Sequence, residues 1–248
     1  MMTRLKQPVF TYALSVLSAA ILLAAAMMPL EARAQTTDDK IFAKVLFDQL
    51  EYVPEPAGQP IGMEAIGWVG GDVNRLWLRA EGEQSTLRRE GETEIEALYG
   101  RLITPYFDFV AGARVDRAWE EAGKTRGHFA VGLQGVAPYR FEVEPTLYVS
   151  DAGNVSAEFT AAYGFQFTQR LILEPELETR IALQDVPEWG IGTGVNNLNL
   201  GLRLRYEFHR KFAPYIGYDQ NWRFGETADF AGGDTSDGAL VFGVRVWR

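Results

Sequence analysis

Charged side chains recur at alternate positions in this chain, and their spacing decides what chemistry they can do. Within residues 75–83, Arg75, Arg79 and Glu81 share one face of an expected strand, whereas Leu76 lies on the other face. Carboxylates and guanidinium groups on one face predict cross-strand ion pairs that hold a wall of strands together. The same charges also fit a second role, a cation-attracting path through a polar interior.

Several expected strands contribute charges of this kind to one polar interior. The predicted interior charges are Arg75, Arg79, Glu94, Glu96, Arg114, Glu142, Glu144, Glu176, Glu178, Arg203, Arg205 and Arg245. Glu176 or Glu178 is expected near Arg203 or Arg205, because one loop joins the two strands that carry them.

Few side chains can bind a soft or borderline metal. The chain has no Cys and two His, and Met63 is the one Met that follows the apolar N-terminal run. His128 and Met63 are the predicted metal ligands, with a water-bonded histidine and a packing methionine as the alternatives. His209 is expected in a short turn at the far end of a strand from His128, so these two cannot share a site. No Ser is placed obviously opposite His128, and no enzyme activity is expected.

The N-terminus predicts a secretory signal peptide over residues 1–34. Arg4 and Lys6 form a basic start, residues 9–30 are almost wholly apolar, and residues 32–34 read Ala-Arg-Ala, a small-x-small cleavage box. A retained membrane anchor is the alternative reading of the long apolar run. We expect a short leader at 35–40 and one β-domain at 41–248.

Alternating faces and turn residues predict twelve strands in that domain. Their expected ranges are 41–52, 61–69, 73–83, 92–103, 106–116, 127–136, 139–150, 154–167, 171–184, 198–208, 212–224 and 239–247. Residues 53–60, 117–126, 185–197 and 225–238 are expected as loops. The faces of residues 41–52 are ambiguous, because Lys44 and Asp48 share one face while Gln49 and Glu51 share the other.

The connections alternate in length, which predicts an antiparallel transmembrane β-barrel of the bacterial outer membrane. Short turns are expected at 70–72, 104–105, 137–138, 168–170 and 209–211, and all intervening connections except 151–153 are long. Outer-membrane barrels have an even strand number, short periplasmic turns and longer outer loops. A soluble lipocalin-like barrel is the alternative, but its usual eight strands would account for only part of the chain length.

Aromatic residues gather beside the expected short turns, as in the aromatic girdle of a membrane barrel. They are Trp68, Tyr106, Phe107, Tyr139, Phe141, Phe165, Phe167, Tyr206, Phe208, Phe212 and Trp247. The net charge of −9 and the absence of a basic stripe exclude nucleic acid as a partner.

Five separated motifs resemble the copper-resistance protein B family of outer-membrane proteins. They are residues 70–83 (GGDVNRLWLRAEGE), 48–51 (DQLE), 97–101 (ALYGR) before Pro105, 111–116 (AGARVD) and 243–245 (GVR). The resemblance covers about residues 43–248. It implies an outer-membrane barrel that takes part in copper resistance and homeostasis, binds or passes copper ions transiently, and has a periplasmic copper oxidase or carrier as a partner. A general small-solute porin or a structural barrel is the alternative function.

Two features depart from the family pattern. Members often carry a Met- and His-rich segment before the barrel, whereas residues 35–40 contain neither Met nor His. Cu(I) prefers thioether and thiolate ligands, and Cu(II) prefers imidazole with oxygen donors, so the missing segment removes the expected soft ligands. An aromatic last residue is expected as an assembly signal, and here Trp247 is penultimate.

Overall fold

The computed structural model describes residues 40–54, 60–87, 90–119, 123–233 and 235–248. The predicted signal peptide at 1–34 and all of the predicted leader except Lys40 lie outside these residues. Both boundaries therefore stay predictions. Among the described residues, no helix is long and apolar enough to cross a membrane.

Strands make up most of the described residues. They are β1 (Phe42–Tyr52), β2 (Pro60–Gly70), β3 (Asn74–Ser85), β4 (Gly91–Thr104), β5 (Phe107–Trp119), β6 (Lys124–Ala137), β7 (Phe141–Ser150), β8 (Val155–Ala162), β9 (Phe165–Gln166), β10 (Leu171–Ala182), β11 (Gly194–Tyr206), β12 (Phe212–Arg223) and β13 (Ser236–Trp247). The helical elements are the 3-10 turns η1 (Pro138–Arg140) and η2 (Pro187–Trp189) and the helix α2 (Gly225–Phe230).

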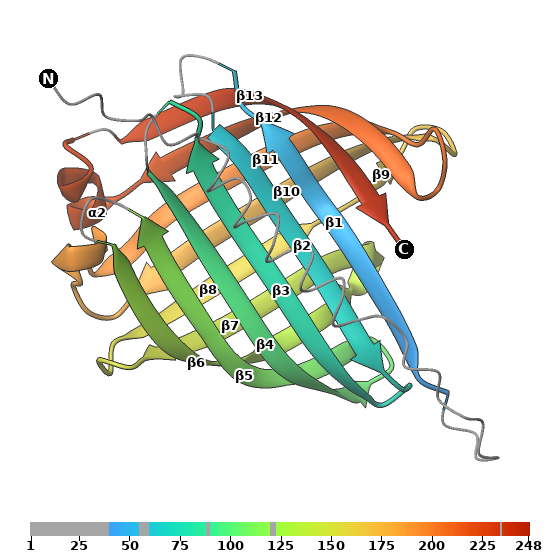
Figure 1. Cartoon of the computed structure of the whole chain (residues 1–248), viewed down its shortest axis with the longest axis horizontal. Helices are drawn as coiled ribbons and strands as arrows, with labels where there is room; N and C mark the ends of the chain where they lie inside the picture. Colours follow the sequence, from blue (N-terminus) through green and yellow to red (C-terminus); the bar gives the residue numbers. More distant parts are fainter. Residues whose placement is uncertain (1–39, 55–59, 88–89, 120–122, 234) are drawn as a thin grey trace, which may run out of the picture.

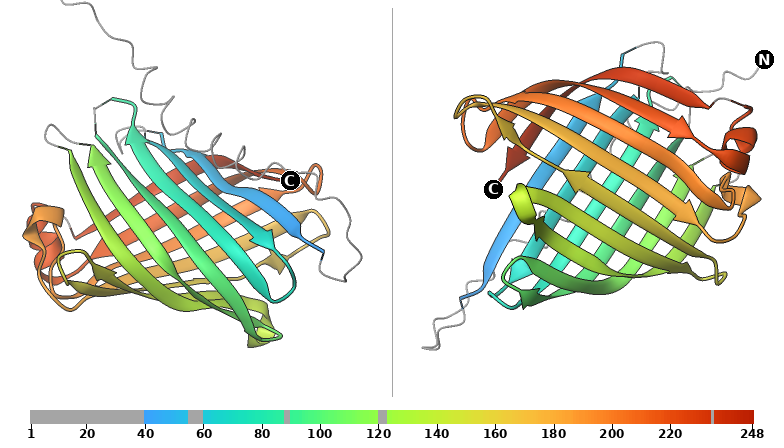
Figure 2. Two further views of the ribbon diagram at one scale, coloured as in Figure 1. Left: turned by 60° about the horizontal axis from the view of Figure 1, so that its bottom comes forward. Right: turned by 180° about the vertical axis from the view of Figure 1, so that it is seen from behind.

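The strands close into one antiparallel barrel (Figure 1; Figure 2). Neighbours in the chain are neighbours in the sheet, β10 also pairs with β11, and β1 pairs with β13 to complete the ring. β8 and β9 both pair with β10 and share one place in the ring, so the thirteen segments form a 12-stranded barrel. The predicted all-β, antiparallel barrel of twelve strands is confirmed.

A proline breaks the strand that was predicted over 154–167. The Tyr163 N–H donates to the Pro175 carbonyl of β10 at 3.1 Å. Proline has no N–H to donate in return. Regular pairing with β10 therefore stops at Ala162 and resumes at Phe165, and the prediction of one unbroken strand is wrong.

The two ends of the barrel differ, and we name them by their connections. The turn end holds the short links β2–β3, β4–β5, β6–β7, β9–β10 and β11–β12, together with the start of β1 and the end of β13. The loop end holds the other connections, including η2 and α2. The predicted alternation of short and longer connections is therefore present, with both barrel termini at the turn end.

Several predicted boundaries are wrong, mostly because strands run further toward the loop end than expected. Arg117 pairs with Thr125, so the loop predicted at 117–126 is mostly strand. The strands after the two last loops begin at 194 and 236, inside the regions predicted as loops, and 225–230 is helical. At the turn end, Tyr139 and Arg140 have φ of 65° and 70°, so Tyr139 belongs to η1 and does not begin a strand. Charged and glycine-rich residues led to the prediction of loops at 117–126, 185–197 and 225–238. Such residues are also compatible with the ends of strands, where both faces can be hydrated.

The alternation of faces is as predicted for β3. Leu76 is 44% exposed on the outside, whereas Trp77 is 8% exposed and faces the interior. Trp77 belongs to an apolar cluster of buried side chains inside the barrel. The members of this apolar cluster are Trp77, Leu98, Val110, Ala130 and Tyr148, with Ile66 and Trp68 packed against it. Trp68 is therefore an exception to the predicted aromatic girdle, because it packs against the interior cluster.

Gly112 lets β4 and β5 approach each other beside this cluster. A Cβ on Gly112 would lie 2.8 Å from Leu98 Cα and even nearer the Ala97 carbonyl oxygen, which real contacts exclude. We expect Gly112→Ala to separate the strands and to lower the temperature at which the folded band is lost on unboiled gels. Gly62→Ala is the control, because its nearest neighbour would be Glu51 Cβ at 3.8 Å. An unchanged melting temperature for Gly112→Ala would contradict the packing argument.

Candidate functional site: an acidic cavity inside the barrel

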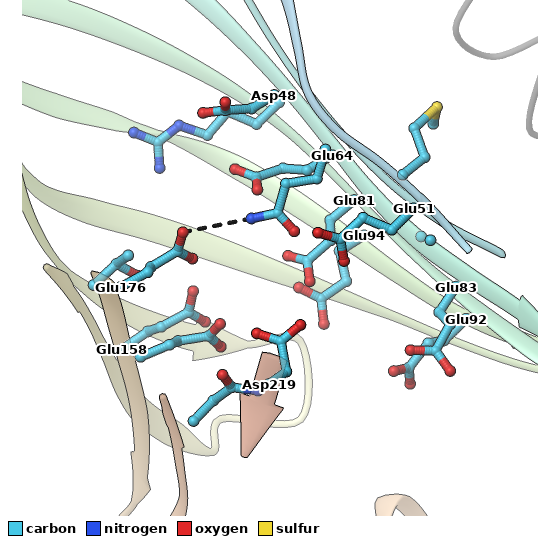
Figure 3. Close-up of a pocket in the computed structure, with 18 of the residues that line it drawn as sticks. Asp48, Glu51, Glu64, Glu81, Glu83, Glu92, Glu94, Glu158, Glu176 and Asp219 are labelled. Atoms are coloured by element: carbon cyan, nitrogen blue, oxygen red, sulfur yellow. Dashed lines mark hydrogen bonds between the residues drawn. The ribbon is translucent and has the colours of Figure 1, made fainter. Parts of the chain in front are cut away.

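Carboxylates dominate a cavity of about 600 Å³ inside the barrel. Sixteen acidic residues and five arginines line it. The acidic residues are Asp48, Glu51, Glu64, Glu81, Glu83, Glu92, Glu94, Glu96, Glu142, Glu144, Glu158, Glu174, Glu176, Glu178, Asp219 and Asp237, and the arginines are Arg79, Arg114, Arg180, Arg203 and Arg223. Figure 3 labels many of these carboxylates, among them Glu64, Glu94 and Glu176, around the cavity. The excess of negative charge makes the cavity a place that attracts cations.

Nine of the twelve predicted interior charges line this cavity. The other three, Arg75, Arg205 and Arg245, form ion pairs nearer the turn end: with Asp108 at 3.0 Å, Glu174 at 2.8 Å and Asp48 at 2.8 Å, respectively. Alternation along the strands therefore predicted these positions well.

A β-bulge in β1 brings both of its acidic side chains to the cavity. The register with β2 shifts between Phe47 and Gln49, so one extra residue, Asp48, lies in the bulge. Asp48, Gln49 and Glu51 all line the cavity, although simple alternation separates Asp48 from the other two. The ambiguous faces predicted for residues 41–52 are explained by this bulge.

One ion-paired network crosses the barrel interior. Arg180 on β10 contacts Glu94 on β4 at 3.1 Å and Glu158 on β8 at 3.0 Å. β4 and β10 stand nearly opposite each other in the ring, so the pair ties two walls together. Arg114 on β5 joins the same network, with contacts to Glu94, Asp116 and Glu158 at 2.5, 2.6 and 3.2 Å. Charge-assisted contacts of this kind fix the wall geometry and narrow the lumen.

A second network surrounds Arg203 on the other side of the cavity. Arg203 Nε donates to Glu51 Oε1 at 2.8 Å, and its guanidinium group also contacts Asp219 at 3.2 Å and Glu176 at 3.8 Å. The Tyr215 hydroxyl donates to the same Glu51 oxygen at 2.9 Å. The predicted neighbourhood of Glu176 and Arg203 is thus present.

Other carboxylates in the cavity have no basic partner among the residues that the structure describes. Glu64 lies directly opposite Glu81 on the next strand, and Glu83 lies directly opposite Glu92. Figure 3 places these side chains together on one wall. Like charges directly opposite each other destabilise a sheet, so these four positions do not strengthen the wall.

The cavity runs along much of the barrel. Its lining includes loop-end residues such as Glu83, Arg223 and Asp237, and on β7 it continues toward the turn end as far as Glu142, the second residue of that strand. The apolar cluster fills the interior beside β2–β7. Arg75 lies beyond the cluster, where its guanidinium carbon is 5.2 Å from the centre of the Trp68 ring.

Further carboxylates stand outside the cavity at the loop end. Asp185 accepts hydrogen bonds from the Thr193 hydroxyl and, at 2.6 Å, from the Thr193 backbone N–H, and these bonds lower the pKa of the Asp185 carboxyl. The negative charge of Asp185 raises the pKa of Glu226 on α2. The loop end therefore presents acidic groups toward the same side as the cavity mouth.

The predicted metal ligands His128 and Met63 are not brought together. His128 on β6 faces the interior, with Nε2 3.0 Å from Asp116 Oδ2 and its ring against Tyr148 at 6.0 Å. Met63 on β2 is 8% exposed and is one of the residues that line the acidic cavity, whereas His128 is not. His209 lies in the β11–β12 turn at the other end of the barrel from His128. Among the described residues, no group of three His, Cys, Asp or Glu side chains has the geometry of a metal site.

Some residues of the site were not singled out from the sequence. Tyr148 donates to Glu96 at 2.7 Å, Glu158 joins both arginines of the cross-barrel network, and Glu64 and Asp219 line the cavity. The alternating pattern placed Glu158 and Tyr148 on a polar face. Only the folded barrel reveals that they meet residues from distant strands.

The closed antiparallel ring and its polar interior are those of an outer-membrane barrel. Similar solved structures include the NanC porin, which is 12% identical with a TM-score of 0.51 over 83% of this chain and 99% of the porin chain. The KdgM porin is 10% identical with a TM-score of 0.50 over 82% of this chain and 98% of the porin chain. At these identities the likeness shows the fold alone.

Sequence similarity gives the family. Residues 41–248 match the family described as "Copper resistance protein B precursor (CopB)". The copper resistance protein B homolog of Pseudomonas syringae pv. tomato is 39% identical over 216 residues, which cover 86% of this chain and 72% of the relative. Copper resistance protein B of Escherichia coli is 39% identical over 213 residues, which cover 85% and 71%. The chain belongs to the copper resistance protein B family, and the predicted resemblance is confirmed.

Proposed function

We propose that this barrel lies in the bacterial outer membrane and takes part in copper resistance by binding or passing copper ions in its acidic cavity. The observation that supports this most directly is the charge of the cavity wall, with sixteen carboxylates and five arginines, in a member of a copper resistance family. In this placement the turn end faces the periplasm and the loop end faces outward, as in outer-membrane barrels.

The cavity offers oxygen donors in place of a soft-ligand site. Cu(II) accepts carboxylate oxygens, whereas Cu(I) prefers sulfur. The unpaired carboxyl groups of Glu64, Glu81, Glu83 and Glu92 would offer oxygen ligands to Cu(II), and the ion-paired networks would keep the wall in shape. Copper is then a transient cargo, and a periplasmic copper oxidase or carrier would act on it at the turn end.

Copper-dependent growth tests this proposal. We expect deletion of the gene to change copper tolerance and periplasmic copper content, and the wild-type chain to restore both. A variant with Glu64→Gln, Glu81→Gln and Glu92→Gln should restore much less, because it removes three unpaired charges and leaves the arginine networks intact. The measurements are growth across a copper series and copper content by mass spectrometry.

The matched control removes acidic residues outside the cavity. Glu188→Gln together with Asp229→Asn changes the loop end and leaves the cavity lining intact. This control should restore tolerance as the wild type does. Copper sensitivity and copper content that are unchanged by the deletion would contradict the proposal.

A general small-solute porin is the alternative function, and ion-pair geometry weighs against it. The Arg180–Glu94 contact at 3.1 Å crosses the lumen, where a general porin would need open space. Planar-bilayer recording separates the two: a wide conductance without preference among ions would favour the porin.

A further inference from the structure

The turn end carries a set of exposed basic side chains that the acidic cavity does not use. We define the basic rim as Lys40, Arg101, Arg140, Arg170, Arg210, Lys211 and Arg248, all of which are exposed. The acidic residues in the same turns are Asp72 and Glu207. This end of the barrel is therefore positive, whereas its interior is negative.

The basic rim differs from the interior arginines in whether its charges form ion pairs within the described residues. Arg75, Arg79, Arg114, Arg180, Arg203, Arg205 and Arg245 each form an ion pair with a described carboxylate. No member of the basic rim does so within the ranges that the structure describes; Lys211 instead has its ammonium 5.4 Å from the centre of the Trp247 ring. The rim charges are thus available to an anion outside the chain.

The basic rim lies where a lipid surface would meet the barrel. Arg101 follows Tyr99 on the outer face of β4, and Tyr99 is 53% exposed. Tyr106, Tyr139 and Phe167, in the neighbouring turns, are 69%, 86% and 63% exposed. Aromatic side chains followed by basic ones are typical of the level of lipid headgroups.

The distribution of the basic rim around the barrel indicates what kind of partner it binds. Its members come from β4, from the β6–β7, β9–β10 and β11–β12 turns, and from both ends of the described chain. A protein partner would cover one sector of this circle, whereas lipid headgroups surround the whole barrel. We propose that the basic rim binds the headgroups of anionic phospholipids in the leaflet that faces the turn end. This inference rests on the proposed outer-membrane placement but not on copper.

Lipid retention tests the proposal. The full chain and a variant with Arg101→Gln, Arg140→Gln, Arg170→Gln and Lys211→Gln would be folded into vesicles with one third phosphatidylglycerol in phosphatidylcholine. After mild detergent extraction, we expect the wild-type barrel to be enriched in phosphatidylglycerol by several-fold over the vesicle composition. The variant should lose most of this enrichment, and so should the wild type in high salt, because salt screens exposed charges.

Controls keep the test decisive. Arg117→Gln removes an exposed positive charge at the loop end, outside the cavity, and should leave the enrichment unchanged. If the fourfold variant does not fold, Arg140→Gln and Arg170→Gln are measured singly, since both are exposed turn residues. Full phosphatidylglycerol enrichment in the rim variants would overturn the proposal. The proposal would also be overturned if the rim variants bound an acidic periplasmic protein less well than the wild type while retaining the same bound lipid. Copper tolerance, measured in parallel, reports on the proposed function separately.

Discussion

Arg114→Gln is expected to destabilise the folded barrel by about 3–5 kcal/mol, the typical effect of removing one partner from a buried ion pair. The Arg114 side chain is 8% exposed and contacts three carboxylates, Glu94, Asp116 and Glu158. It also lies 4.8 Å from the centre of the Tyr148 ring. Without the Arg114 guanidinium group, the three carboxylates would repel one another with one fewer positive charge among them.

Reversible urea unfolding in detergent micelles, followed by tryptophan fluorescence, measures this effect. Arg101→Gln is the control, since Arg101 is exposed, and its expected effect is within about 0.5 kcal/mol. Adding Asp116→Asn to Arg114→Gln should recover part of the loss, because an uncharged partner no longer needs a cation. Equal urea midpoints for Arg114→Gln and the wild type would show that the network does not stabilise the barrel.

Trp77→Ala is expected to widen the lumen beside β2–β7 and to raise single-channel conductance several-fold. The apolar cluster fills this side of the interior, and Trp77 is its largest member. Apolar constrictions close pores by excluding water, so removing the indole should let water and ions through. The same change should cost about 3–5 kcal/mol of stability, as for other buried aromatic side chains.

Planar-bilayer recording of purified barrels tests this prediction. Tyr99→Ala, on the outer face of the next strand, removes an aromatic ring outside the lumen and should leave conductance unchanged. Gly100→Val gives a second route, because a Cβ at Gly100 would lie 2.6 Å from Trp77 Nε1 and would displace the indole. Wild-type conductance in Trp77→Ala would mean that the apolar cluster does not limit the passage of ions through the lumen.

The sequence by itself determined the fold class and the faces of most strands. A strand points successive side chains to opposite faces, so period-two charge placed Arg79, Glu94 and Arg203 inside without any knowledge of their neighbours. Turn residues between the alternating segments predicted twelve strands, alternating connection lengths predicted a membrane barrel, and separated motifs predicted the family. These signals are local, or depend only on order along the chain.

Only the tertiary structure decided which interior charges meet, because that depends on barrel closure and strand register. Arg180 and Glu94 are far apart in sequence, and they meet because β4 and β10 are nearly opposite in the ring. Chain order likewise cannot give the one-residue bulge at Asp48. The break that Pro175 causes in the neighbouring strand depends on register in the same way. The acidic cavity and its unpaired carboxylates are therefore properties of the closed barrel, although each residue that makes them was visible in the sequence.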